Sequence, residues 1–278
     1  MASDNKENFN YFENHGPIQQ ANFQVSSFKF YADGSLGSRS ALLKQAYTDQ
    51  HQHHGINTLN PDSFLLRLNK LVQMGFQANT HCIGDSALKV VLNAYGKALG
   101  QVPDHRWRIE HVQVADSASL AKFRELAVIP SMQPTHGVSD AHWAAKRLGE
   151  ERLKWAYSLE KARQQLGIIA LGTDFPIESP NPMGTFIAAS EATNLNLDSL
   201  PSNTLTGKTL SRLHALKGMG NWAALSVFQE EKVGTIEVGK QADFVILDID
   251  LLKAPVEKLA KTKVLYTLKN GEVVFEAI

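Results

Sequence analysis

"FQANTHCIGDSALKVVLNAYGKALG", residues 76–100, decides the fold. Its first seven residues are typical of a buried strand, and from Asp85 onward apolar residues recur at the i, i+3, i+4, i+7 spacing of an amphipathic helix. Gly100 ends that pattern. A strand followed directly by a helix is a βα unit, which indicates a parallel sheet.

The same alternation extends on both sides of this segment, over residues 23–190. It predicts an α/β fold whose parallel sheet is either doubly wound or closed into a barrel, and the pattern alone does not choose between the two. The expected strands lie within residues 23–34, 76–82, 106–113, 128–134 and 168–174, and the expected helices within 60–75, 85–100, 116–127 and 150–167.

The two ends of the chain have a different character. Residues 1–22 lack sustained periodicity and are expected to form a loop or N-terminal arm. Residues 209–228 predict one or two helices broken near Gly218 and Gly220, and short β segments follow from about residue 233. Asn270-Gly271 is a strong hairpin signal. We therefore divide the chain into an arm (1–22), a main domain (23–225) and a C-terminal β segment (226–278).

Composition narrows the classes of partner. The 28 basic and 28 acidic side chains give a formal net charge of zero. The sequence has no basic patch interleaved with aromatic residues, so binding to nucleic acid is not expected. The apolar runs are too short to span a bilayer. The single cysteine, Cys82, excludes an intrachain disulfide, so a cytoplasmic protein that acts on small molecules is expected.

Polar residues gather at the expected carboxyl ends of the strands: Lys29, Asp33, His81, His111 and Asp174. In a parallel βα architecture these ends open on one face, where active sites are built. Two imidazoles and a carboxylate are suitable ligands for a divalent cation, and zinc is the cation we expect. Asp174 could then accept a proton from water during hydrolysis and return it.

Each of these residues also has a structural interpretation. His81 or His111 alone could be a buried ring bonded to a carbonyl oxygen, and Asp174 could cap a helix. A protonated Lys29 would repel a cation and could pair with Asp33 instead. A neutral Lys29 amine could add carbon dioxide and become a carbamate ligand.

Six motifs resemble the amidohydrolase superfamily, specifically the amidohydrolase-3 branch that includes N-substituted formamide deformylase-like enzymes. The resemblance runs from about residue 24 to the C-terminus and is carried by KFYADGSLGSRSA, THCIGDSA, RIEHVQ, SMQPTHGVSD, LGTDFPIESPNP and VGTIEVGKQADFVILD. It implies a TIM-type (β/α)8 barrel in which Lys29 is a metal-bridging, carboxylated lysine. His81 and His111 would be metal ligands, and Asp174 the acid that binds metal and activates water.

The resemblance also implies a reaction and two further site residues. The chain would be a metal-dependent hydrolase that cleaves amide-like C–N bonds of small molecules. Asp85 and His136 would lie near the substrate or support the metal ligands.

One departure from the family pattern affects this expectation. The HxH metal motif of the first barrel strand does not precede Lys29, and the only HxH, His51 and His53, lies in a polar loop after it. We therefore expect a truncated, partial barrel of about the last five βα units with a small C-terminal β appendage. Its open edges would pair with a second copy or with a complementing N-terminal half. The alternative function is an inactive fragment that serves as a binding or assembly module.

Overall fold

A computed structural model describes residues 1–278 except 22, 101, 198–204, 206 and 278. The chain forms two compact units. Unit 1 comprises residues 1–131, 143–156 and 162–167, and unit 2 comprises residues 132–142, 157–161 and 168–278.

Unit 1 is built on a parallel sheet. Its strands are β1 (Ala2–Ser3), β4 (Ser27–Tyr31), β5 (Gln77–Cys82), β6 (Arg108–His111) and β7 (Ile129–Met132), in that order across the sheet. Each neighbouring pair is parallel. The predicted α/β class is confirmed, and β4, β5, β6 and β7 lie within predicted strand ranges. The single strand expected over residues 23–34 is in fact two, because Phe23–Val25 forms a separate strand in another sheet.

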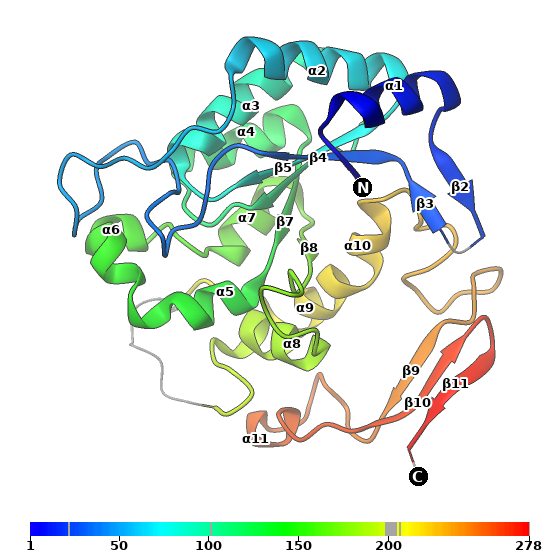
Figure 1. The fold of residues 1–278 in the computed structure, drawn as a ribbon. Helices are drawn as coiled ribbons and strands as arrows, with labels where there is room; N and C mark the ends of the chain where they lie inside the picture. The colour runs from blue at the N-terminus through cyan, green and yellow to red at the C-terminus, as the bar shows by residue number, and fades with distance from the viewer. Residues whose placement is uncertain (22, 101, 198–204, 206, 278) are drawn as a thin grey trace. The chain divides into compact units, whose positions relative to one another are not determined.

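Three helices follow one another beside this sheet: α2 (Pro61–Met74), α3 (Asp85–Leu99) and α4 (Ser117–Leu126) (Figure 1). Helix α3 contacts both α2 and α4, and α2 and α3 contact β5. The Asn60 side chain accepts a hydrogen bond from Ser63 N at the start of α2, and Gly75, with φ 71°, ends it in the left-handed region. The side-chain cap at Asn60 and the glycine at residue 75 explain why the sequence predicts both ends of α2 correctly.

Residues 1–22 differ from the expected loop. Residues Lys6–His15 form helix α1, and Ile18–Gln20 (β2) pairs antiparallel with Phe23–Val25 (β3). The helix buries Phe9 and Phe12 against Phe28 of β4, with ring centroids 4.5 and 5.7 Å apart. This segment is therefore attached to the core of unit 1 by aromatic packing.

The single helix expected over residues 150–167 is also wrong. The structure has α6 (Ala144–Leu153) and α7 (Leu159–Leu166), and Tyr157 between them has a φ of 54°. A left-handed residue cannot continue a right-handed helix. The Tyr157 hydroxyl donates to Asp140 Oδ2 at 2.8 Å, a tertiary contact that the local sequence does not reveal.

Unit 2 contains the short strand β8 (Ala170–Leu171). Within this unit, Gly172 N donates to the carbonyl of Met132, the last residue of β7, at 3.2 Å. Its helices are α5 (Pro134–Ser139), a 3-10 turn at Asp140–His142, α8 (Pro182–Glu191), α9 (Arg212–Met219) and α10 (Asn221–Leu225). The predicted break between α9 and α10 is confirmed and falls at Gly220.

A small antiparallel sheet closes the chain, as predicted. It contains β9 (Phe244–Leu247), β10 (Val264–Lys269) and β11 (Glu272–Glu276), with the short helix α11 (Val256–Leu259) between β9 and β10 (Figure 1). The hairpin at Asn270-Gly271 is confirmed, with φ values of 52° and 83° at its two residues. Positive φ at both positions is what a type I′ turn requires.

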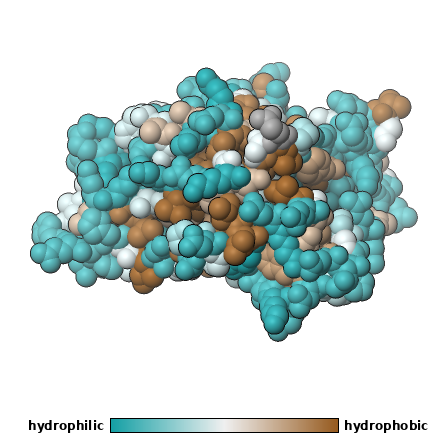
Figure 2. All heavy atoms as spheres, turned by 90° about the horizontal axis from the view of Figure 1, so that it is seen from above, coloured by the Kyte–Doolittle hydropathy of each residue, from teal (hydrophilic) through white to brown (hydrophobic). Residues whose placement is uncertain are grey.

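The surface mixes hydrophilic and apolar residues. Figure 2 shows one face on which apolar residues gather in the middle and hydrophilic residues surround them. No helix among the described residues has the length and apolar character needed to cross a bilayer.

Candidate functional site

The sheet of unit 1 has one polar and one apolar face. Side chains alternate along each strand, and the strand register places Lys29 beside Asn79 and Asn79 beside Arg108. Asn79 is fully buried, and neither atom of its amide has a hydrogen-bond partner among the described residues. A buried amide without a partner carries a desolvation cost, so it lowers the stability of the fold. The polar row formed by Lys29, Asn79 and Arg108 therefore has a role other than stability.

His81 lies at the end of β5 on the same face. Its Nε2 is 3.5 Å from Asp33 Oδ1 and 3.3 Å from the Gly34 carbonyl oxygen. Its ring centroid is 5.4 Å from that of Tyr31, and the Lys29 Nζ lies 5.2 Å from the Tyr31 ring centroid. Lys29 and His81 therefore both lie near the same aromatic side chain.

Asp33 holds the loop after β4 against the start of α3. Its carboxylate accepts hydrogen bonds from the backbone N–H groups of Leu42, Ile83 and Gly84, at 2.8, 3.0 and 2.7 Å. Burial raises the pKa of Asp33 to about 6, although these hydrogen bonds oppose the shift. The geometry gives Asp33 a structural role beside His81 and supplies no ion pair to Lys29.

His111 reaches His81 through an unusual backbone. In the strand register it lies opposite Cys82, whose side chain points to the apolar face. At His111, however, φ is 75°, in the left-handed region. The ring lies edge-on to that of His81, with 4.5 Å between the centroids. Strained conformations of residues other than glycine cluster at functional sites, so this outlier supports a functional role.

Unit 2 contributes a second cluster, formed by His136 of α5 and the loop after β8. His136 Nε2 is 3.3 Å from Asp174 Oδ2, and His136 Nδ1 is 3.2 Å from Glu178 Oε1. Burial lowers the pKa of His136, but the hydrogen bonds and charges of Asp174 and Glu178 outweigh it and raise the pKa to about 9. His136 is thus an imidazolium held between two carboxylates at neutral pH.

Sequence reasoning missed Glu178. It lies four residues after Asp174 in the same loop, and its pKa is lowered chiefly by the hydrogen bond from His136. Nothing in the local pattern distinguishes it from a surface acid. Asp174 itself has a φ of 61°, a second left-handed residue at a predicted site position.

The other histidines and acids singled out in the sequence lie elsewhere. Asp85 is buried and accepts a hydrogen bond from Lys44 N at 2.9 Å, which anchors the loop before α2 to the start of α3. His53 of the HxH pair bonds the Arg39 carbonyl oxygen through Nε2, at 2.7 Å. Cys82 is buried, and burial raises its pKa well above the usual value, so it is a core residue as expected.

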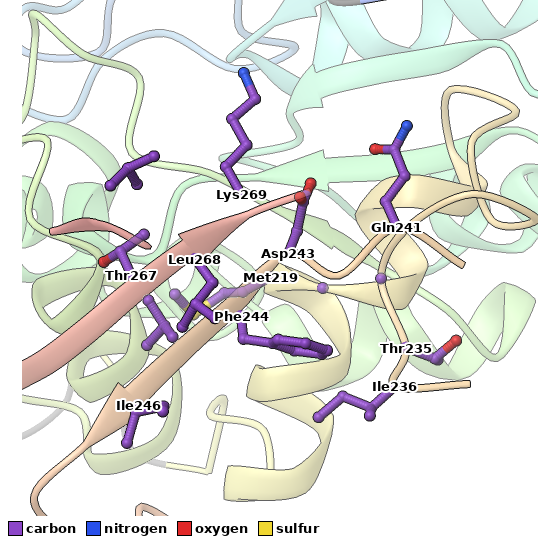
Figure 3. Close-up of a pocket in the computed structure, with 14 residues that line it drawn as sticks. Met219, Thr235, Ile236, Gln241, Asp243, Phe244, Ile246, Thr267, Leu268 and Lys269 are labelled. Carbon is purple, nitrogen blue, oxygen red and sulfur yellow. The ribbon is translucent and has the colours of Figure 1, made fainter. Parts of the chain in front are cut away.

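A cavity of about 790 Å³ lies against the small sheet of unit 2 (Figure 3). Phe244, Ile246 and Leu268 give it apolar walls, with Asp243, Gln241 and Lys269 among its polar lining residues. The described lining contains none of the predicted site residues and no histidine, so this cavity offers no imidazole for a metal.

The chain matches a model of the amidohydrolase family over residues 3–275. Protein LONG AFTER FAR-RED 3 of Arabidopsis thaliana is 33% identical over 228 residues, which are 80% of this chain and 38% of that protein. N-substituted formamide deformylase of Arthrobacter pascens is 25% identical over 246 residues, 85% of this chain and 43% of that enzyme.

A solved structure, described as an uncharacterized metal-dependent hydrolase from Pyrococcus furiosus, superposes with a TM-score of 0.78 at 32% identity. The match covers 89% of this chain and 50% of that one. The chain thus spans less than half the length of the two curated relatives and half of that structure. With a match over nearly its whole length, the chain belongs to the amidohydrolase family, in the amidohydrolase-3 branch that its sequence motifs resemble.

Proposed function

We propose that this protein is a metal-dependent hydrolase that cleaves amide-like C–N bonds of small molecules. The single observation that carries the proposal is the edge-on pairing of His81 and His111, which places two imidazoles at neighbouring strand ends. Family membership and the deformylase named among the relatives support the reaction class. The sheet belongs, in this proposal, to a partial (β/α)8 barrel.

The donor set fits a divalent cation such as zinc. His81, His111 and Asp174 provide two imidazoles and a carboxylate, the combination that catalytic zinc sites use. A carboxylated Lys29 would supply a further oxygen ligand. Growth with 13C-bicarbonate should then give a carbamate signal that Lys29→Arg lacks, and an unlabelled wild-type protein would exclude the modification.

A divalent cation held by these residues would supply Lewis acidity toward the substrate carbonyl and toward water. Asp174 accepts a proton from the attacking water and delivers it to the leaving nitrogen as the C–N bond breaks. His136 donates a hydrogen bond to Asp174 and holds its carboxylate in place, while Glu178 fixes the other side of the His136 ring.

Metal analysis combined with turnover tests the proposal. Purified protein should hold about one zinc per chain and hydrolyse N-ethylformamide to formate and ethylamine. His81→Ala and His111→Ala should lose the zinc, and Asp174→Asn should lose turnover. His15→Ala, which removes an exposed imidazole at the end of α1, is the matched control and should keep both. Protein without zinc or turnover under zinc-replete conditions would favour the alternative, an inactive binding or assembly module.

A further inference from the structure

Unit 2 has a second cavity, of about 370 Å³, which lies beside the cluster of His136, Asp174 and Glu178. Glu178 and Ser139 line it. The Ser139 hydroxyl donates to Glu178 Oε1 at 2.7 Å, and the same oxygen lies 3.2 Å from His136 Nδ1. One wall of the cavity is therefore also one side of the proposed catalytic cluster, and the volume lies in the range of small-molecule sites.

Most of the lining is apolar, and its polar groups are the imidazole of His142, one carboxylate, and uncharged amides and hydroxyls. Asn181, Asn194 and Asn196 contribute amides, and Thr135, Ser139 and Ser179 contribute hydroxyls. Glu178 is the one carboxylate among the described lining residues, which include no lysine or arginine. Its Oε1 is already engaged by Ser139 and His136, so a cationic ligand would compete with two existing donors.

Thr135 adds an independent indication of a ligand. Its hydroxyl oxygen is buried and has no hydrogen-bond partner among the described residues, while its side chain lines the cavity. A hydroxyl in this state pays a desolvation cost that a ligand hydrogen bond would recover. Val138, Ala188 and Leu195 supply apolar surface beside it for a carbon chain.

We propose that this cavity is a substrate subsite that receives an uncharged, hydrogen-bonding substituent carried on an aliphatic chain, such as a hydroxyalkyl group. The inference rests on the proposed hydrolase function and names its substrate class. The scissile C–N bond would lie at the His136 end of the cavity, with the substituent extending past Glu178 toward Thr135.

Gly184 of α8 provides a way to fill the subsite. A Cβ there would lie 3.7 Å from Leu195 Cδ1 and 3.9 Å from Thr135 Cγ2, both ordinary contacts. Gly184→Leu would therefore place its side chain between these two cavity walls without forcing the backbone, and leucine is the better helix former. Ser190→Ala, on the same helix, removes a hydroxyl that bonds the Phe186 carbonyl and is absent from the described cavity lining. It is the matched control.

The experiment compares kcat/KM of the zinc-loaded protein for N-ethylformamide with that for four longer formamides of matched length. Their chains end in a hydroxyl (N-(4-hydroxybutyl)formamide), a methyl (N-pentylformamide), an ammonium (N-formylputrescine) or a carboxylate (N-formyl-4-aminobutyrate). The hydroxyl compound should be preferred over the other three. Gly184→Leu should lower its kcat/KM relative to N-ethylformamide by about tenfold or more, and Thr135→Val should remove its advantage over the methyl compound. Ser190→Ala should change neither ratio.

Unchanged ratios in Gly184→Leu and Thr135→Val, with N-ethylformamide still hydrolysed, would overturn the subsite and leave the hydrolase function standing. Preference for the ammonium compound would overturn the assigned substrate class. If no formamide is hydrolysed, saturation-transfer NMR with N-(4-hydroxybutyl)formamide decides. Binding to the wild type that Gly184→Leu abolishes supports the subsite, and equal signals in both proteins, or none in either, overturn it.

Discussion

The ring of His111 meets the ring of His81 edge-on, at an interplanar angle of 71°. This pairing depends on the left-handed backbone at His111, because a regular strand would direct the side chain to the face of Cys82. Asparagine adopts that backbone readily, and a β-branched residue does not.

His111→Asn should therefore lose bound zinc while its free energy of unfolding falls by less than about 1 kcal/mol, whereas His111→Val should cost about 1–2 kcal/mol more. Urea denaturation of the metal-free proteins measures the difference. Equal stabilities for the two variants would show that the backbone at this position carries no conformational constraint.

Asn79→Leu tests whether the buried amide of Asn79 lowers the stability of the protein while it supports turnover. Replacing a partnerless buried amide by an apolar side chain of similar size removes its desolvation cost. Asn79→Leu should raise the free energy of unfolding by about 1 kcal/mol and lower the turnover of N-ethylformamide. Thr80→Val is the control, since it removes a hydroxyl that bonds Tyr95 at 2.8 Å and should destabilise. Destabilisation by Asn79→Leu would indicate that the amide is satisfied.

Helix α1 should depend on a few aromatic contacts. Phe9 is 6% exposed and stacks on Phe28, so Phe9→Ala should lower the free energy of unfolding by about 3–5 kcal/mol. Tyr11 on the same helix is 47% exposed, and Tyr11→Ala should change it by less than about 1 kcal/mol. Similar small effects of both substitutions would mean that α1 is not part of the cooperative core.

The His136 cluster predicts a pH dependence of stability in the metal-free protein. The pKa of His136 rises from 6.5 unfolded to about 9 folded. Its contribution is thus fully present below pH 6.5 and is lost as the pH rises through 9, a change on the order of 3 kcal/mol. Denaturation between pH 6 and 10 and an NMR titration of the ring measure both effects. Glu178→Gln should lower the ring pKa, and a wild-type pKa near 6.5 would refute the ion-pair assignment.

Gly84 should tolerate no side chain. A Cβ at this residue would lie 2.0 Å from the Leu42 carbonyl oxygen, so the loop held by Asp33 would have to move. Gly84→Ala should cost at least about 3 kcal/mol. In Gly96→Ala, inside the helix α3 that follows Gly84, the Cβ first meets Leu126 Cδ2 at 3.3 Å, and the loss of stability should be small or reversed. A stable Gly84→Ala protein would show that this loop adjusts freely.

Local patterns predicted much of this fold from the sequence. Helices α2 and α3 and strand β5 follow from periodicity and end residues that act within one turn. Helix α1 was missed because it buries only Phe9 and Phe12, and its stabilising partner Phe28 is distant in sequence. The break at Tyr157 depends likewise on Asp140, a tertiary partner.

The candidate site was predictable only as residue types at strand ends. The sequence supplied Lys29, His81, His111, His136 and Asp174, but not the backbone that directs His111 toward His81. The sequence also did not identify Glu178, because the role of this carboxylate depends on its contact with His136, which is distant in sequence. Whether these residues and Asp85 act as metal or substrate ligands stays a prediction for the experiments above.

Side chains alternate between two faces along the six residues of β5. Selection for chemistry and selection for a stable fold therefore act on different residues of this strand. Asn79 and His81 face the polar side, while Ala78 and Cys82 are buried on the helix-covered side. Substitutions at the first pair should impair chemistry in protein that still accumulates, and bulky substitutions at the second pair should reduce the amount of protein in the cell. A saturation scan scored separately for abundance and turnover should therefore yield two profiles with a two-residue period, each the complement of the other.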